Sequence, residues 1–243
     1  MNSIYGIIGH PLSHSFSPAY FNEKFTREHI NAQYKAFELP YIHDLPEILK
    51  NHPTLRGLNV TIPHKQAIID QLDALSSEAA EVGAVNCIDI RDGILKGYNT
   101  DVIGFERSLA PVLQPHHRHA LIFGTGGAAL AVKFVLRKLG IPFKEVSRKR
   151  TTATLSYSDI DEAILKEHTL LINTTPLGMY PHTDEAPDIP YSAISEKHLL
   201  YDLIYNPPET RFLLKGKEQG AAIKNGLDML KLQADASWEI WSS

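Results

Sequence analysis

The chain has 243 residues, of which 43% are hydrophobic and 21% charged, the balance of an ordinary globular protein. Its formal net charge of -4 excludes the global basic field that nucleic-acid-binding proteins use. One cysteine, Cys87, excludes an intrachain disulfide framework and favours a reducing compartment. No basic segment followed by an apolar run opens the chain, and no stretch approaches the ~20 apolar residues of a membrane-spanning helix. We therefore expect a cytoplasmic protein.

Short apolar strands alternate with helix signals in the first hundred residues. Residues 4–8 predict a strand, and Ser17 followed by Pro18 predicts the start of a helix, because proline suits the first turn. Residues 58–62 alternate apolar and polar side chains, which predicts a strand with one polar face. The proline after this strand ends it, so Lys65 should follow its carboxyl end.

A hairpin and a second unit are expected next. Residues 84–90 and 94–98 flank a polar turn and predict two antiparallel strands. A helical pattern over 102–113 then begins a second unit. Beyond it, four short apolar runs suit the buried strands of a parallel sheet, at 119–123, 143–147, 170–173 and 199–203.

The same pattern predicts the fold class. Strands that alternate with helical segments favour a doubly wound α/β domain, here preceded by another α/β domain. The last helix carries an apolar stripe at helical spacing, made of Leu230, Ala234, Trp238 and Trp241. It is long enough to pack back on the first domain.

A glycine-rich turn between the first two strands of the second unit predicts a nucleotide site. Gly124-Thr125-Gly126-Gly127-Ala128-Ala129 follows a predicted strand, opens a predicted helix and fits G-x-G-x-x-G/A. Its glycines allow close approach of a pyrophosphate to the amides of the helix N-terminus. The alternative is a glycine-rich turn that binds nothing.

The residues after the next strand indicate which dinucleotide would bind. An NAD site usually places an acidic residue there, whereas this chain has Ser147-Arg148-Lys149-Arg150. Arginine can hold a 2′-phosphate with paired charge-assisted hydrogen bonds, and a carboxylate would repel it. Glu145, the nearest acid, lies within the strand. The run therefore favours NADP over NAD, with a solvated basic loop as the alternative.

Lys65 and Asp101 are the candidate reactive residues. A lysine past the carboxyl end of a strand is where open α/β sheets place ligand groups. Each residue has an alternative role, because Lys65 could be an exposed lysine and Asp101, or Thr100 before it, a helix N-cap. Twelve histidines invite a metal site, but the run at 116–119 has no cysteine or acidic partner at ligand spacing, so we expect no metal.

Seven segments resemble, in order, the motifs of the shikimate dehydrogenase family. They are Ser13-His14-Ser15-Phe16-Ser17-Pro18, 59–65, Gly83-Ala84-Val85-Asn86, Asn99-Thr100-Asp101, 173–179, 202–207, and Asn225-Gly226-Leu227 with the helix after it. The resemblance implies reversible hydride transfer between NADPH and the C3 carbonyl of 3-dehydroshikimate, giving shikimate. It also implies that Lys65 donates the proton while Asp101 orients it.

The resemblance implies further roles and a domain division. Substrate contacts would come from Ser15, Ser17, Thr61, Asn86, Tyr205 and Gln233. Cofactor contacts would come from Gly124, Thr125, Gly126, Gly127, Ala128, Ser147, Arg148, Lys149, Thr174, Leu203 and Gly226. Residues 1–101, with 226–243 returning to them, would form the substrate-binding domain, and 102–225 the Rossmann-like NADP domain. Ser17 could instead cap its helix, Asn86 stabilise a turn, and Gln233 or Tyr205 serve packing.

Three departures and two rival readings accompany this resemblance. Cys87 stands where the family commonly has threonine, Ser147-Arg148-Lys149 stands where Asn-Arg-Thr is frequent, and Asp228 stands where glycine is frequent. One rival is a quinate/shikimate dehydrogenase that uses NAD; the other is a shikimate-binding regulatory relative without catalysis. We expect a small-molecule substrate, no nucleic-acid or membrane partner, and a monomer or homodimer.

Overall fold

The computed structural model describes residues 2–13 and 15–243, which form two compact units. The first unit contains the chain up to Thr100 together with Ala234–Ser243, and the second is Asp101–Gln233. Helix α8 (Leu227–Ser242) contributes residues to both units. None of the helices in the described part of the chain is both long and apolar enough to cross a membrane.

The first unit is built on a mixed six-stranded sheet of order β2-β1-β3-β5-β6-β4. Its strands are β1 (Ser3–Gly9), β2 (Ala32–Glu38), β3 (Leu55–Val60), β4 (Ala74–Leu75), β5 (Cys87–Arg91) and β6 (Ile94–Tyr98). β1 pairs in parallel with β2 and β3, whereas β5 is antiparallel to β3 and β6. The predicted hairpin is confirmed, and its turn places Asp92 and Gly93 at φ 51° and 81°, the conformation that a two-residue hairpin turn requires.

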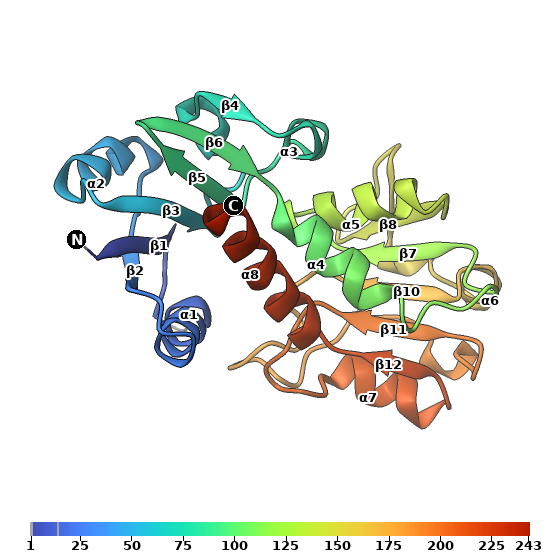
Figure 1. Ribbon diagram of the computed structural model, residues 1–243. Helices are drawn as coiled ribbons and strands as arrows, with labels where there is room; N and C mark the ends of the chain where they lie inside the picture. Colours follow the sequence, from blue (N-terminus) through green and yellow to red (C-terminus); the bar gives the residue numbers. More distant parts are fainter. Residues whose placement is uncertain (1, 14) are drawn as a thin grey trace. The chain divides into compact units, whose positions relative to one another are not determined.

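Helices cover both faces of this sheet (Figure 1). They are α1 (Ser17–Arg27), α2 (Leu45–Asn51), α3 (Ser77–Val82), the C-terminal part of α8, and the short 3₁₀ helices η1 (Ile42–Asp44) and η2 (Ala67–Gln71). Successive residues of β1 point to opposite faces. Ile8 packs with Leu45 of α2, whereas Ile7 packs with Phe21 of α1 and Trp241 of α8.

One sequence expectation in this sheet was wrong. The polar alternation of 58–62 predicted a strand with a polar face, but β3 ends at Val60 and Asn59 is only 5% exposed. Its amide oxygen accepts a hydrogen bond from the Tyr34 hydroxyl at 2.7 Å, and its amide nitrogen donates to Ser237 at 2.9 Å. The polar residue is therefore buried because partners on β2 and α8 satisfy it.

The second unit contains a parallel six-stranded sheet of order β12-β11-β10-β7-β8-β9. Its strands are β7 (Ala120–Phe123), β8 (Phe143–Ser147), β9 (Thr154–Ser156), β10 (Leu170–Asn173), β11 (Leu199–Asp202) and β12 (Ala222–Lys224). Its helices are α4 (Thr100–Leu109), α5 (Gly127–Lys138), α6 (Glu162–Glu167), α7 (Arg211–Glu218), the start of α8, and the 3₁₀ helices η3 (Tyr157–Asp159) and η4 (Tyr191–Ala193). In chain order the strands run 3-2-1-4-5-6, the doubly wound dinucleotide-binding arrangement. The predicted α/β class is confirmed.

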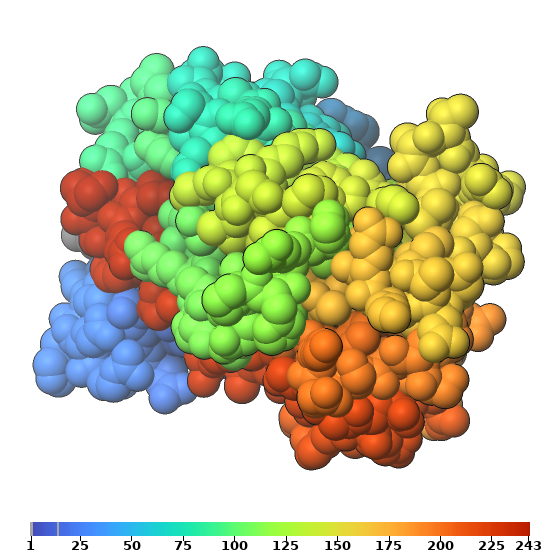
Figure 2. All heavy atoms as spheres, turned by 90° about the vertical axis from the view of Figure 1, so that its right-hand side faces the viewer, coloured from blue at the N-terminus to red at the C-terminus, as the bar shows by residue number. Residues whose placement is uncertain are grey.

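The loops that precede β7, β10 and β11 lie together at the amino ends of these parallel strands, in green to orange in Figure 2. Thr169 donates a hydrogen bond to the His116 carbonyl at 3.1 Å, and the His116 ring lies 3.1 Å from the Lys197 carbonyl. His117 is 4% exposed, and its Nδ1 accepts a hydrogen bond from the Gln114 amide at 3.0 Å. Burial, aided by neighbouring His116, lowers the pKa of His117 to about 4.

We expect His117 to make the protein less stable in acid. Its pKa is about 4 in the folded chain and 6.5 ordinarily, so the unfolded chain binds the proton more tightly. This contribution is complete above pH ~6.5 and is lost as pH falls toward ~4. His117→Asn keeps an acceptor for Gln114 but does not titrate. Urea unfolding should therefore show a smaller loss of stability in this variant than in wild type between about pH 7.5 and about pH 4.5. His182→Asn, at an exposed histidine, should follow the wild type, and equal slopes for all three proteins would contradict the prediction.

Candidate active site

The segment after β3 places Lys65 at the carboxyl end of a buried strand. Thr61 donates its amide to Ile8 at 2.9 Å, which continues the β1–β3 ladder for one residue. The His64 ring is buried, and its Nε2 lies 2.5 Å from the Leu39 carbonyl. Lys65 is half-buried, and its carbonyl accepts the Val85 amide at 2.7 Å. Contacts of His64 before it and of its own carbonyl therefore fix the Lys65 backbone. A fixed backbone limits the directions that the lysine side chain can take.

Asn86 joins this segment to the start of α4. Its side-chain oxygen accepts the Thr100 amide at 2.6 Å, and its side-chain nitrogen donates to the Thr100 hydroxyl at 3.0 Å. Asn99 adds a bond from its side chain to the Ala84 carbonyl at 2.9 Å. Hydrogen bonds thus bring together the segments that carry Lys65, Asn86 and Thr100 within the first unit.

Asp101 follows Thr100 in the first turn of α4. It is 8% exposed, and a carboxylate in a first helical turn is favoured by the positive end of the helix dipole. The Asn86 side chain, rather than Asp101, accepts the Thr100 amide at the beginning of this helix. Lys65 belongs to the first unit and Asp101 is the first residue of the second, so their pairing stays a prediction.

The two predicted serines lie at the start of α1. Ser15 is half-buried, and His14 beside it lies outside the described residues. Ser17 is the first residue of α1 and is 7% exposed. The alternative that Ser17 caps the helix is wrong, because Phe16 occupies the N-cap without a side-chain cap bond. Burial raises the pKa of Tyr34 well above its ordinary value, an effect that a hydrogen bond with the Ser17 side chain partly offsets.

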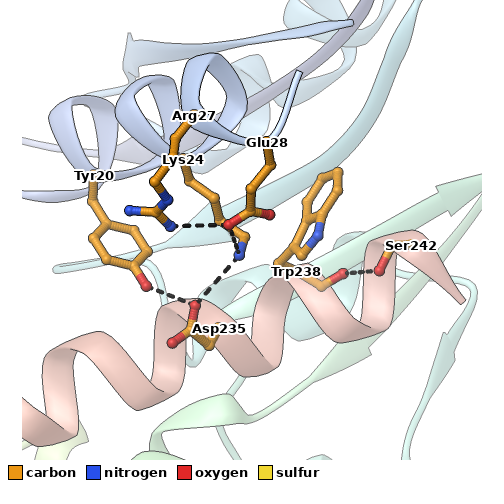
Figure 3. Close-up of polar contacts among 7 residues, drawn as sticks. All are labelled: Tyr20, Lys24, Arg27, Glu28, Asp235, Trp238 and Ser242. Carbon is orange, nitrogen blue, oxygen red and sulfur yellow. Dashed lines mark hydrogen bonds and ion pairs between the residues drawn. The ribbon is translucent and has the colours of Figure 1, made fainter. Parts of the chain in front are cut away.

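Helix α8 is fixed against α1 by polar contacts at the edge of this region (Figure 3). The Tyr20 hydroxyl donates to Asp235 at 2.6 Å, and the Lys24 ammonium lies 3.9 Å from the same carboxylate. Burial, followed by the Asp235 hydrogen bond, raises the pKa of Tyr20. Lys24 also bonds Glu28 at 3.0 Å, and Arg27 bonds Glu28 at 2.9 Å.

Gln233 and Tyr205 are the two predicted substrate contacts of the second unit. Gln233 is half-buried, and its side chain donates to the Leu230 carbonyl at 2.9 Å. Tyr205 is also half-buried, and this burial raises the pKa of its hydroxyl. Both side chains therefore keep part of their surface exposed to solvent.

The glycine-rich turn has the geometry that a pyrophosphate needs. Gly124 has φ 106°, and a Cβ there would lie 2.6 Å from the Thr174 hydroxyl, so only glycine fits. A Cβ at Gly126 or Gly127 would meet no atom within 4 Å. Gly126 is the N-cap of α5 and supplies no side-chain acceptor. The space beside the first amides of α5 therefore remains open to an anion. Thr125 is exposed, and Ala128 lies in the first turn.

The basic run after β8 contains two distinct environments. Arg150 forms an ion pair with Asp159 at 3.1 Å. Arg148 and Lys149 are exposed, and neither has a carboxylate within ion-pairing distance among the described residues. Ser147 donates its hydroxyl to the Lys149 carbonyl at 2.5 Å, which closes the turn.

Glu145, the only acid in β8, is already paired. It lies 3.1 Å from the Lys133 ammonium, and both side chains are largely buried. It is therefore not presented to a ribose hydroxyl, and the two accessible cations suit a 2′-phosphate.

The remaining cofactor candidates lie where β10 and β11 end. The Thr174 hydroxyl donates to the Phe123 carbonyl at 2.8 Å, and the Leu203 amide donates to the Asn173 carbonyl at 3.0 Å. Gly226 packs so closely on Leu203 that a Cβ would collide with the Leu203 carbonyl. Gly226 must therefore remain glycine for this edge to keep its shape.

Sequence reasoning missed the buried acid that supports this edge. Asp202 is fully buried and accepts hydrogen bonds from Thr210 at 2.6 Å, from the Ile204 amide at 3.0 Å and from Asn173 at 3.1 Å. Burial raises its pKa to about 6, although these three donors oppose the effect. Asp202 precedes Leu203 and its partner Asn173 precedes Thr174, so one carboxylate orders both strand ends. The signal available in the sequence was a polar residue at the end of each apolar strand.

Asp228, for which the sequence offered no account, lies in the first turn of α8 and forms an ion pair with Lys224. It therefore neutralises a lysine at the end of β12. Tyr201, also unremarked in the sequence, is buried and bonds Ser108 of α4 at 2.6 Å.

Comparisons with known proteins agree with this geometry. Residues 7–88 match the family described as shikimate dehydrogenase substrate binding domain. The NADP(+) shikimate dehydrogenase of Methanococcus maripaludis is 40% identical over 256 residues, covering 98% of this chain and 91% of the relative. The corresponding enzyme of Methanosphaera stadtmanae is 37% identical over 258 residues, with the same coverage.

A solved structure extends the likeness to three dimensions. Shikimate 5-dehydrogenase from Thermus thermophilus, in complex with NADP(H) and shikimate, superposes with a TM-score of 0.87 at 32% identity. The match covers 99% of this chain and 93% of that one. Identity above 30% over nearly the full length of both chains shows common descent as well as a common fold, and the chain therefore belongs to the shikimate dehydrogenase family.

Proposed function

We propose that this chain reduces 3-dehydroshikimate to shikimate with NADPH, reversibly, and so acts in the supply of aromatic amino acids. The observation that carries the proposal is the set of hydrogen bonds that fixes the Lys65, Asn86 and Thr100 segments to one another. Three segments far apart in sequence meet there, and each carries a polar side chain able to contact a hydroxylated ring.

The residues divide the chemistry as follows. Bound NADPH would supply a hydride for the C3 carbonyl carbon of the substrate. Negative charge then develops on the carbonyl oxygen, and the Lys65 ammonium stabilises it and donates a proton. Asp101 orients that ammonium and accepts a hydrogen bond from a substrate hydroxyl. Asn86 binds the ring hydroxyls with Thr61, Gln233 and Tyr205, while Ser15 and Ser17 hold the carboxylate.

The second unit holds the cofactor. The amides of α5 at Gly126, Gly127 and Ala128 would hold the pyrophosphate, with Thr125 beside them in the turn. Arg148 and Lys149 would bind the 2′-phosphate, and Ser147 shapes their turn. Thr174, Leu203 and Gly226 would contact the rest of the cofactor. We propose that the chain up to residue 101, joined by 226–243, forms the substrate-binding domain and 102–225 the NADP domain. The compact units divide the chain at slightly different positions, with Asp101 and residues 226–233 in the second unit.

The rival activities have a direct test. Initial rates with shikimate and with quinate, each with NADP and with NAD, follow the absorbance of the reduced nicotinamide. We expect the highest kcat/KM with shikimate and NADP. Preference for quinate with NAD would favour the first rival, and a shikimate-dependent melting shift without cofactor reduction would favour the non-catalytic relative. We further propose that the protein is cytoplasmic and that it is a monomer or a homodimer. Sedimentation of the purified chain distinguishes these two oligomeric states.

Lys65→Ala should lower kcat by about 10²-fold or more, because removing a general acid usually costs that much. The same assay with Lys50→Ala, at an exposed lysine of α2, should give wild-type rates. Near-normal turnover of Lys65→Ala would remove this residue from the chemistry.

Arg148→Ala should raise the KM for NADP by roughly 10-fold or more, since a charge-assisted hydrogen bond contributes about 1.5–3 kcal/mol. The KM for NAD should stay unchanged, because that cofactor has no 2′-phosphate. Arg150→Ala is the matched control, since Arg150 is already paired with Asp159. An equal effect at both arginines would point to the general charge of the loop instead.

Gly126→Ala should leave the melting temperature within about 2 °C of wild type, because its Cβ meets no protein atom within 4 Å. The affinity for NADP, measured by quenching of intrinsic fluorescence, should fall by about 10-fold, since the methyl occupies the space of the pyrophosphate. Unchanged affinity would favour a turn that binds no nucleotide.

A further inference from the structure

A buried polar cluster in the first unit joins four elements around a single hydroxyl of α8. Ser237 is fully buried, and its hydroxyl lies 2.9 Å from the Asn59 amide nitrogen and 3.1 Å from the Thr100 hydroxyl. The cluster, here called the Ser237 junction, contains Tyr34, Asn59, Asn86, Thr100 and Ser237. It lies within the residues of one compact unit.

Thr100 links Ser237 to Asn86 within the junction. The Asn59 amide donates to Ser237, and it also lies 3.2 Å from the Asn86 carbonyl. The Thr100 hydroxyl lies 3.1 Å from Ser237, and either hydroxyl can be the donor. The same Thr100 hydroxyl accepts a hydrogen bond from the Asn86 amide nitrogen at 3.0 Å, and the Asn86 amide oxygen accepts the Thr100 amide at 2.6 Å. Ser237 therefore holds the residue that contacts both ends of the Asn86 side chain.

Removal of this hydroxyl has a predictable consequence. Without Ser237, the Thr100 hydroxyl loses one hydrogen bond and the Asn59 amide loses an acceptor in the interior. Loss of a buried hydrogen bond is costly, so these side chains rearrange. Because Thr100 contacts both ends of the Asn86 amide, the orientation of the Asn86 side chain changes with it.

We propose that Ser237 is a positioning residue for the dehydrogenase reaction, which acts through Thr100 and Asn86 to set the substrate contacts at the start of α4. Ser237 itself does not touch the substrate. This inference rests on the proposed function, because Asn86 matters here as a substrate contact and Asp101 as the residue that follows Thr100.

Cys87 of β5 is a further contact of the Ser237 hydroxyl. Cys87 is fully buried on β5 directly after Asn86, and a hydrogen bond links its thiol to Ser237. A threonine at this position, as in the resemblance noted above, would place a hydroxyl on β5 itself. A thiol is a weak donor and acceptor, so in this chain Ser237 is the stronger hydrogen-bonding group of the pair.

The test compares Ser237→Ala with the double variant Cys87→Thr/Ser237→Ala. In the single variant, kcat/KM for shikimate should fall about 10-fold, as expected for the loss of one or two buried hydrogen bonds. The KM for NADP should stay within about twofold, because the cofactor residues lie in the other unit. The double variant returns a hydroxyl to the junction, and its kcat/KM should recover to within about threefold of wild type.

Ser242→Ala is the matched control on the same helix, since Ser242 is exposed and bonds only the Trp238 carbonyl. Wild-type kinetics are expected there. A Ser237→Ala enzyme that melts earlier but keeps its kcat and its KM for shikimate would overturn the proposal, as would a double variant that regains thermal stability without activity. Failure of the proposed function is a separate result, namely a wild-type chain that does not reduce NADP with shikimate.

Discussion

The constraint on which the first unit depends is that its interior polar groups must bond one another, because water does not reach them. Asn59, Asn86, Thr100 and Ser237 are each at most 5% exposed. Each is bonded to another member of the group, and none of the buried polar side-chain atoms among the described residues lacks a partner. A network of this kind is stable only when it is complete. Its completion holds the segments of Lys65, Asn86 and Thr100 in one arrangement within the first unit.

The second unit solves the same problem in a different place. In a parallel sheet, ligands bind at the carboxyl ends of the strands. A buried carboxylate at these ends must therefore be hydrogen-bonded while the ends themselves stay accessible to a ligand. Asp202 accepts hydrogen bonds from three donors at the ends of β10 and β11. Leu203 and Thr174, the next residues along the chain, remain partly exposed. In both units, then, a residue proposed to bind a ligand follows directly after a buried residue that fixes the backbone. This neighbour relation explains why long motifs, rather than single residues, mark the sites.

The sequence predicted the parts of the fold that depend on local chemistry. The hairpin around Asp92-Gly93 and the turn at Gly124 follow from backbone conformations that few residues adopt. The basic run after β8 was also visible, because the charges are consecutive. What local pattern could not predict was burial of polar residues. Asn59 was assigned to a polar face, yet its partner Ser237 lies 178 positions away in the chain.

Cofactor choice and substrate choice depend on different properties of the chain. Cofactor choice follows from charge, since Arg148 and Lys149 are accessible while Glu145 is paired with Lys133. Substrate choice depends on the orientation of amides and hydroxyls, which spacing does not encode. Asn86 illustrates the point, because the same side chain that is assigned to the substrate also accepts the first amide of α4. Its nitrogen also donates to the Thr100 hydroxyl, so both ends of this amide are oriented by the first residue of the helix. The direction in which Asn86 presents its polar atoms is therefore set by Thr100, a contact that no spacing of residues along the chain reveals.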